Sequence, residues 1–437
     1  MQLSSVLNTT KQDRDINLNE WIETSIWTEN MLIALDNGVK GGKWFSLIDK
    51  VYSLKTLKIA WQQVKSNKGS AGVDKISIER FEINEEKYLQ ELHNAIKEGN
   101  YIPKPVKRVY IPKAGGKKRP LGIPVVKDRI VQTALKLVIE PIFENEFLDM
   151  SYGFRPNRGC KDALKEVDSL LKDGYTWVVD ADFKSYFDTI PHNKLMSLLN
   201  LQISDQQLLD LIQKYLKQNI VDGLEKWSPV AGTPQGAVLS PLLANIYLHP
   251  LDIMLSNLGL KVVRYADDFV ILSKSKQESI MALNSVKEWV SKYNLQLHPD
   301  KTHIGNSSIK SQGFEFLGYR FEKGKRFVRK KSLKSFRDKV RDKTKRSRSG
   351  SMNEIIADLN PMLKGWFGYF KHAYKSTFKA NDGFVRRRLR AILLKRNKKK
   401  RCFGITINAH KIYTNHYFAQ LNLFTSHEAW VLAYQSR

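Results

Sequence analysis

Apolar residues along the chain follow two periods, one typical of strands and one typical of helices. Strand-forming residues flank an Asp-Asp pair at 262–274, open the stretch 175–188 as Trp-Val-Val, and form two runs joined through Ala-Gly-Gly-Lys-Lys at 101–126. Helical spacing appears in other segments, at 25–51, 54–65, 128–150, 194–217, 279–293, 359–374 and 384–395. Pro141 is a position at which a helix is expected to kink or divide. The pattern therefore predicts an α+β fold.

Two of the predicted strands carry acidic residues. Asp267 and Asp268 stand at the expected tip of a hairpin, and period-two geometry sends Asp180 and Asp182 of the upstream strand to one face. An Asp-Asp pair taken alone is more typical of a solvated turn. With the second acidic strand nearby, three carboxylates around hard cations become possible, which is the two-metal arrangement for nucleotidyl transfer, with Mg²⁺ ions about 3.5 to 4 Å apart.

The charge balance indicates a polyanionic partner. Lysine and arginine number 72 against 44 acidic residues, which gives a formal net charge of +28 and a pI near 9.8. Because no lipid-anchoring motif or basic amphipathic helix stands out, nucleic acid is favoured over a membrane. The run 323–350 holds fourteen of these basic residues. Such runs are usually disordered or form a solvated face, but opposite an RNA backbone they supply sequence-independent affinity.

Cysteine usage and hydropathy bear on the compartment. Cys160 and Cys402 are the two cysteines, which excludes a disulfide framework and a zinc site built on paired Cys-x-x-Cys motifs and fits a reducing compartment. The first twenty residues lack the apolar core of a signal peptide, and no run of 18 apolar residues occurs. We therefore expect a soluble protein of the bacterial cytoplasm or nucleoid, without a membrane partner.

Three motifs together resemble the reverse transcriptases of group II introns. They are Tyr-Ala-Asp-Asp at 265–268, Asp-Phe-Lys-Ser-Tyr-Phe at 182–187, and Gly-Thr-Pro-Gln-Gly at 232–236 followed by Ser-Pro-Leu-Leu-Ala-Asn-Ile-Tyr-Leu. The similarity runs from about residue 25 to the end. It implies a right-hand polymerase with fingers, an antiparallel palm sheet with packed helices, and a helical thumb. The resemblance also implies that two Mg²⁺ ions are held by three catalytic aspartates: Asp182, Asp267 and Asp268.

The same resemblance divides the chain into parts. The implied parts are an N-terminal extension at 1–50, fingers at 51–175, a palm at 176–325, a thumb that doubles as the maturase domain at 326–395, and a small C-terminal DNA-binding tail at 396–437. Residues 313–319 resemble the primer-grip strand that closes the palm. The paired cysteines and active-site histidines of the family's endonuclease module are absent, so we expect a member that lacks this module and takes its primer from another source.

The 101–126 hairpin has a cationic tip, which suits a triphosphate whose charge must be neutralised as pyrophosphate leaves. An ordinary basic surface hairpin has the same pattern. In the family, the positions that match Lys113 and Arg119 hold the phosphates of the incoming nucleotide. Lys301 matches a family lysine near these phosphates, although a lysine in this place is also typical of a plain surface.

Two further residues are implied to recognise the nucleotide sugar. Phe187, five residues after Asp182, matches the family's bulky gate, which would clash with a ribose 2′-hydroxyl, so deoxynucleotides are the expected substrates. Gln235 matches the residue that contacts the sugar and the base pair. Ala237 stands where members often have glycine, which is a small departure.

Aromatic and basic residues are mixed in two segments that the resemblance assigns to nucleic-acid contact. Phe154, Arg155 and Arg158 place a ring among guanidinium groups, which suits gripping phosphates or stacking on bases. In the family this block lies along template and primer. The helical thumb carries an arginine cluster that packing alone does not explain: Arg386, Arg387 and Arg388.

Two functions of different classes follow. One is an RNA-directed DNA polymerase that extends a DNA or RNA primer on an RNA template and also acts as a maturase, binding intron RNA in splicing and target DNA in mobility. The other is an RNA-binding splicing factor whose polymerase activity is secondary. Retron-type, diversity-generating or host-reassigned reverse transcriptases are the alternatives within the first class. The oligomeric state stays open at this point.

Overall fold

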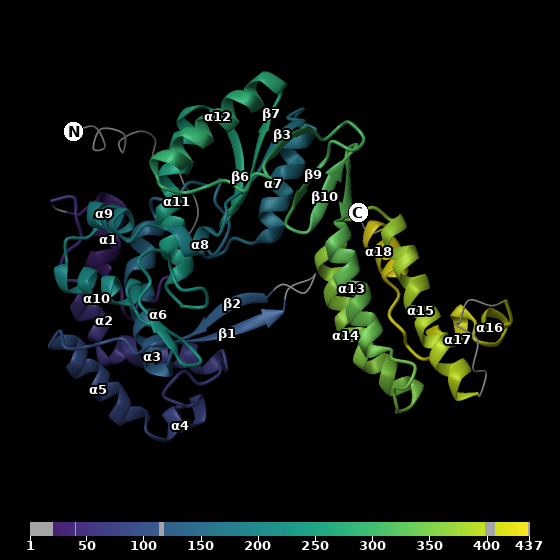
Figure 1. Ribbon diagram of the computed structural model, residues 1–437, viewed down its shortest axis with the longest axis horizontal. Helices are drawn as coiled ribbons and strands as arrows, with labels where there is room; N and C mark the ends of the chain where they lie inside the picture. The colour runs from purple at the N-terminus through teal and green to yellow at the C-terminus, as the bar shows by residue number, and fades with distance from the viewer. Residues whose placement is uncertain (1–20, 40, 113–117, 398–406, 436–437) are drawn as a thin grey trace.

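The computed structural model describes residues 21–39, 41–112, 118–397 and 407–435. Figure 1 shows a large lobe that combines helices and sheets, and a smaller helical lobe that contains the C-terminus. The β1–β2 hairpin of the large lobe extends toward the helical lobe. The mixture of helices and mainly antiparallel sheets confirms the predicted α+β class. No helix among the described residues is long and apolar enough to span a membrane.

The large lobe contains the helices that surround the sheets. Their bounds are α1 Glu29–Asn37, α2 Ile48–Tyr52, α3 Leu54–Ser66, α4 Ile78–Ile83, α5 Glu85–Lys97, α6 Val126–Glu144, α7 Cys160–Lys172, α8 Tyr186–Thr189, α9 His192–Gln202, α10 Gln206–Leu216, α11 Ser240–Asn257 and α12 Lys276–Lys292. Pro141 lies inside α6, and the helix continues past it to Glu144 without dividing.

The central sheet has the strand order β6-β7-β3-β8, and each neighbouring pair is antiparallel. Its strands are β3 Trp177–Asp182, β6 Lys261–Tyr265, β7 Asp268–Ser273 and β8 His303–Asn306. Because successive side chains alternate between faces, the sheet separates two apolar cores. Val179 and Ile271 belong to the core that includes α11 and α12, whereas Val178 and Val270 belong to the core shared with α7 and the next sheet.

A second sheet joins the predicted fingertip hairpin at 101–126 to a short hairpin at 220–227. It has the order β2-β1-β4-β5, with strands β1 Val106–Pro112, β2 Lys118–Ile123, β4 Ile220–Asp222 and β5 Glu225–Trp227. β1 pairs antiparallel with β2 and parallel with β4. The fingertip hairpin is therefore attached to a segment that immediately precedes the Gly-Thr-Pro-Gln-Gly loop.

The third sheet corrects the prediction for residues 313–319. We expected one strand, but the segment holds β9 Phe314–Phe316 and the start of β10 Tyr319–Glu322, which pair antiparallel and continue into β11 Lys325–Val328. The chain reverses at Leu317 and Gly318, both of which have positive φ (46° and 83°). Such φ values favour a turn over an extended strand.

The helical lobe consists of α13 Lys330–Lys343, α14 Met352–Phe370, α15 Ser376–Arg396, α16 Ile407–Ile412, α17 Asn415–Gln420 and α18 Ser426–Gln435. Much of the basic run 323–350 is thus ordered as β11 and α13. α16 and α17 share one apolar core with α14 and α15, to which Ala409 and Phe418 contribute, and α18 contacts α14 and α15. The predicted tail therefore packs onto the thumb helices, while the predicted domain boundaries stay predictions.

Candidate active site

Four carboxylates gather at one end of the central sheet. Asp182 on β3 lies directly opposite Asp268 on β7, and Asp180 is two residues earlier on the same strand. Since opposite residues of an antiparallel pair share a face, Asp180, Asp182 and Asp268 project from the same side of the sheet. Asp267 lies in the turn before β7 and follows Ala266, whose φ is 59°. The register thus brings together the three aspartates predicted from sequence and adds Asp180.

Burial, with repulsion between neighbouring charges, raises the pKa values of three of these carboxylates: Asp180, Asp267 and Asp268. The pKa of Asp268 is raised to about 7, first by burial and then by the charges of Asp180, Asp267 and Asp182. Burial also raises the pKa of Asp180 to about 6 and raises the pKa of Asp267. Asp180 is 9% exposed and receives a hydrogen bond at 3.4 Å from the backbone N–H of Glu315. A cation at this face would relieve the repulsion.

Lys301 already places one positive charge there. Its Nζ lies 2.5 Å from Oδ2 of Asp182, and the lysine and aspartate side chains are 55% and 32% exposed. The backbone N–H of His298 donates to the Asp182 carbonyl at 2.7 Å, so the segment before Lys301 is attached to the end of β3. Within the described ranges, no three His, Cys, Asp or Glu residues form a group that could hold a metal ion. Asp182 is instead paired with the ammonium group.

The turn that carries Asp267 is held by a buried arginine. Arg264 donates to Asp252 at 2.7 Å, to Asn245 at 3.0 Å and to the carbonyl of Ala266 at 3.0 Å, and both Arg264 and Asp252 are fully buried. Gly153 packs against the same turn, because a Cβ at this glycine would lie 2.3 Å from the Ala266 nitrogen. Sequence reasoning missed both residues. An arginine in the middle of an apolar strand was the available signal for Arg264, and Gly153 offered none.

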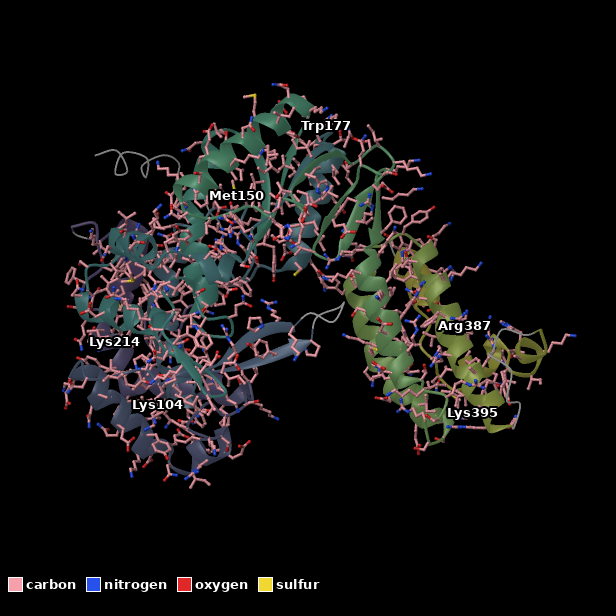
Figure 2. All side chains as sticks on the ribbon, viewed as in Figure 1. Lys104, Met150, Trp177, Lys214, Arg387 and Lys395 are labelled. Atoms are coloured by element: carbon pink, nitrogen blue, oxygen red, sulfur yellow. The ribbon has the colours of Figure 1, made fainter. Side chains whose placement is uncertain are left out.

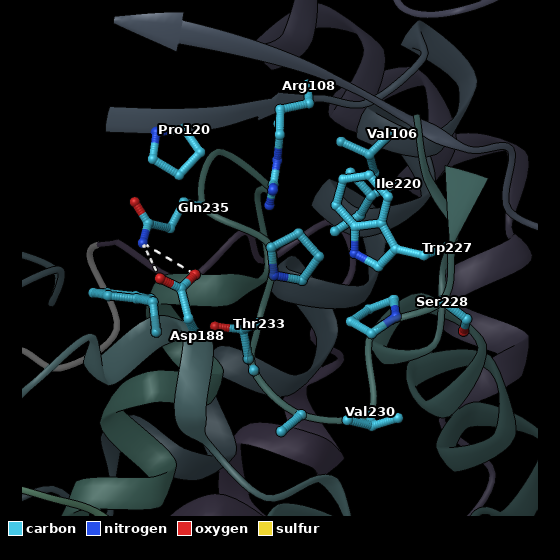
Figure 3. A pocket seen from close by; sticks show the side chains of 16 residues that line it. Val106, Arg108, Pro120, Asp188, Ile220, Trp227, Ser228, Val230, Thr233 and Gln235 are labelled. Carbon is cyan, nitrogen blue, oxygen red and sulfur yellow. Dashed lines mark hydrogen bonds between the residues drawn. The ribbon is translucent and has the colours of Figure 1, made fainter. Parts of the chain in front are cut away.

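The residues predicted to bind the nucleotide, apart from Lys113, lie near the acidic face of the central sheet. Arg119 on β2 donates from Nε to Oε1 of Gln235 at 3.0 Å. Gln235 and Phe187 line one cavity of about 470 Å³ (Figure 3). Arg119 and Lys301 both act to lower the pKa of Asp267 against the effect of burial, so both cations are within electrostatic range of the acidic face. Lys113 lies outside the described residues.

The block 151–164 divides into exposed and buried groups. Phe154 is 48% exposed, and its ring centroid is 6.3 Å from that of Tyr265, beside the turn that carries Asp267. Arg158 donates to Asp149 at 2.6 Å near the surface. Arg155 contradicts its prediction as a nucleic-acid contact, because it is 6% exposed and its guanidinium is bonded to Glu144 and to backbone carbonyls. Its role is to hold this block against α6.

On the thumb, Arg387 is part of a cluster of cations around one ring. The guanidinium carbons of Arg337, Arg341 and Arg387 lie 5.7, 5.4 and 5.3 Å from the ring centroid of Phe384. Figure 2 shows Arg387 on the helical lobe, with Lys395 farther along the same helix. Three like charges around one ring repel one another, which a bound polyanion would offset.

Two neighbouring arginines, Arg388 and Arg390, form hydrogen bonds within the helical lobe. The Arg388 guanidinium donates to the Thr344 hydroxyl at 3.1 Å and to the Thr344 carbonyl at 2.7 Å, which ties α15 to the end of α13. Arg390 is buried and donates to the carbonyl of Tyr413 at 2.7 Å. Arg386 is half-buried. Arg387 is therefore the member of the predicted trio that faces solvent most openly.

Two family models match the chain. Residues 111–321 match the family described as reverse transcriptase (RNA-dependent DNA polymerase), and residues 333–409 match the maturase-specific domain of group II introns. The first match includes both acidic strands and the Gly-Thr-Pro-Gln-Gly loop. The second begins in α13 and reaches into α16, beyond the thumb boundary that we predicted at residue 395.

Curated relatives agree with these matches. The group II intron-encoded protein LtrA of Lactococcus lactis subsp. cremoris is 34% identical over 327 residues, which cover 60% of this chain and 54% of that protein. Protein YkfC of Escherichia coli (strain K12) is 36% identical over 297 residues, covering 58% of this chain and 77% of that protein. The putative COX1/OXI3 intron 1 protein of Saccharomyces cerevisiae is 27% identical over 427 residues, covering 84% and 50%. The chain thus spans about half the length of the first and third.

Removing the buried arginine behind the turn that carries Asp267 is expected to destabilise the protein strongly. Arg264→Met would leave Asp252 buried without its partner, which costs about 3 to 5 kcal/mol of unfolding free energy. Arg158→Met is the matched control, because its ion pair is near the surface and is worth less than about 1 kcal/mol. Denaturant unfolding measures both variants. An Arg264→Met protein as stable as the control would contradict this role.

The raised pKa values predict a pH-dependent stability in metal-free buffer. Because folding raises the pKa of Asp268 from about 3.9 to about 7, its contribution to stability is full below about pH 4 and is lost as the pH rises through 7. The raised pKa of Asp180, about 6, adds to the lower part of this window. The Tm with chelator should therefore fall between pH 5 and pH 8, and Asp268→Asn should flatten the fall. Equal slopes in both proteins would refute the assignment.

Proposed function

Because the chain belongs to the family of group II intron reverse transcriptases and maturases, we propose that it is an RNA-directed DNA polymerase that extends a primer 3′-hydroxyl with deoxynucleotides. The observation that carries the proposal is the acidic face of the central sheet, where Asp182 lies opposite Asp268 and within electrostatic range of Asp267. This face lies within electrostatic range of Arg119 and Lys301. Carboxylates and cations so arranged suit the transfer of a nucleotide from its triphosphate.

Asp182, Asp267 and Asp268 are the residues that would hold two Mg²⁺ ions. Their fit rests on chemistry, because carboxylate oxygens are the ligands that Mg²⁺ prefers, and on geometry, because Asp182 lies directly opposite Asp268 at the end of the central sheet. When bound, the ions would supply charge neutralisation at the phosphates and activation of the primer hydroxyl. Asp182 would have to leave Lys301 to take part, so metal binding and movement of Lys301 are linked in this proposal.

The chain's own side chains would then arrange the nucleotide. Lys301, released from Asp182, and Arg119, released from Gln235, would contact the triphosphate. Phe187 would exclude a 2′-hydroxyl, and Gln235 would contact the sugar. Phe154, exposed beside Tyr265, would contact template or primer.

We further propose that the helical lobe binds intron RNA as a maturase. The match to the maturase-specific domain and the arginines around Phe384 support this role. The C-terminal helices that pack on the thumb would contact target DNA, and the setting would be the bacterial cytoplasm or nucleoid. A splicing factor with secondary polymerase activity is the second candidate, favoured by the same domain match.

Primer extension tests the polymerase directly. On an RNA template with Mg²⁺, the wild type should extend a primer with deoxynucleotides and poorly with ribonucleotides, and Asp267→Ala should slow synthesis on the order of a thousandfold or more. Asp210→Ala, an exposed carboxylate on α10, is the control and should leave the rate unchanged. Wild type that folds, binds RNA and makes no DNA would instead favour the splicing factor.

RNA binding by the thumb has its own signature. Arg387→Ala should weaken binding of structured RNA and reduce the slope of log K against log salt by about 0.7 to 0.9, the value for one lost phosphate contact. Arg80→Ala on α4 removes the same charge from an exposed site on the large lobe and serves as the control. Identical salt slopes for the two variants would remove Arg387 from the RNA interface.

A further inference from the structure

Gln235 connects the fingertip hairpin to the palm through its side chain. Its Oε1 accepts a hydrogen bond from Nε of Arg119 at 3.0 Å, and its Nε2 donates to both carboxylate oxygens of Asp188 at 3.2 Å. Figure 3 shows Asp188 on α8 facing the Gln235 amide. The backbone carbonyl of Gln235 also accepts from the N–H of Gly122 at 2.7 Å. One side chain thus lies between the phosphate-binding strand and the helix that carries Phe187.

The two partners fix which way the amide of Gln235 points. An arginine offers only donors and an ionised carboxylate offers only acceptors, so the amide oxygen must face Arg119 and the nitrogen must face Asp188. The reversed amide would place donor against donor and acceptor against acceptor. Asp188 therefore determines the orientation of a group that is expected to contact the nucleotide.

Backbone hydrogen bonds hold the segment with Asp188 against the loop with Gln235. The N–H of Thr233 donates to the Phe187 carbonyl at 2.7 Å, and the N–H of Gly232 donates to the Ile190 carbonyl at 2.7 Å. Gly232 has a φ of 89°, and a Cβ there would lie 2.8 Å from the backbone of Asp188. Only glycine allows so close an approach. The loop that holds Gln235 is therefore docked directly onto the segment 187–190.

We propose that Asp188 is a positioning residue for nucleotide binding, acting through Gln235. The proposal rests on the proposed polymerase function. When a triphosphate draws Arg119 to its phosphates, Asp188 remains to hold the Gln235 amide with its nitrogen toward the palm. Loss of Asp188 would then weaken nucleotide binding and discrimination at the sugar, and would leave the chemical step little changed.

Access of water limits the effect that replacing Asp188 can have on nucleotide binding. Asp188 is exposed, and both side chains line the open cavity of about 470 Å³, so water will replace a deleted partner. Asp188→Ala should therefore raise the KM for the correct deoxynucleotide about fivefold, with kcat within about twofold. Asp188→Asn should fall between, because its side-chain oxygen still accepts one hydrogen bond. Asp210→Ala should match the wild type.

A double-mutant cycle separates positioning from a general structural role. We would measure the equilibrium Kd of the next correct deoxynucleotide on a template with a dideoxy-terminated primer, for wild type, Asp188→Ala, Gln235→Ala and the double variant. If Asp188 acts through Gln235, the double variant should bind as Gln235→Ala does. Melting temperatures within a few degrees of wild type would show that each variant is folded.

Several results would overturn the proposal. They are an unchanged Kd in Asp188→Ala, effects that multiply in the double variant, or a loss confined to kcat. Because the binding measurement needs no chemistry, it tests the role of Asp188 even if the wild type makes no DNA. Failure of synthesis would count against the proposed function, and failure of the cycle would count against Asp188.

Discussion

Repulsion among carboxylates on one face of the central sheet is the constraint on which the rest of the structure depends. The register between β3 and β7 places Asp180, Asp182 and Asp268 on the same face of the sheet. Placing three carboxylates together beside Asp267, two of them largely buried, is unfavourable without nearby positive charge. Cations from distant parts of the sequence answer this need, since Lys301 contacts Asp182 and Arg119 lies within electrostatic range of Asp267.

Holding the acidic turn in place requires structure behind it that makes no contact with any substrate. The guanidinium of Arg264, paired with Asp252 and fully buried, fixes the carbonyl of Ala266 from inside the palm. Gly153 lets the block 151–164 approach the same turn from its other side. Gly232 similarly lets the loop of Gln235 approach the backbone of Asp188 closely. Close backbone contacts thus fix the positions of the turn that carries Asp267 and of the loop that carries Gln235.

The sequence predicted the hairpins, the acidic strands and most helices, because alternation and helical spacing are local properties. It could not show which way a long side chain points. Arg155 was expected at the surface, yet it pairs with Glu144, eleven residues earlier, inside the protein. The turn at Leu317 and Gly318 was missed because nothing in the apolar pattern of 313–319 marks a reversal. Asp188 was passed over because its partner, Gln235, is 47 residues away.

Asp182, Asp267 and Asp268 are proposed to form a cation site created by their own repulsion. Manganese binding followed by electron paramagnetic resonance, on wild type assembled with template, dideoxy-terminated primer and nucleotide, tests this site most directly. We expect two tightly bound ions in the wild type and loss of at least one in Asp182→Asn. An unchanged number of bound ions in Asp182→Asn, or no tight binding in the wild type, would contradict it.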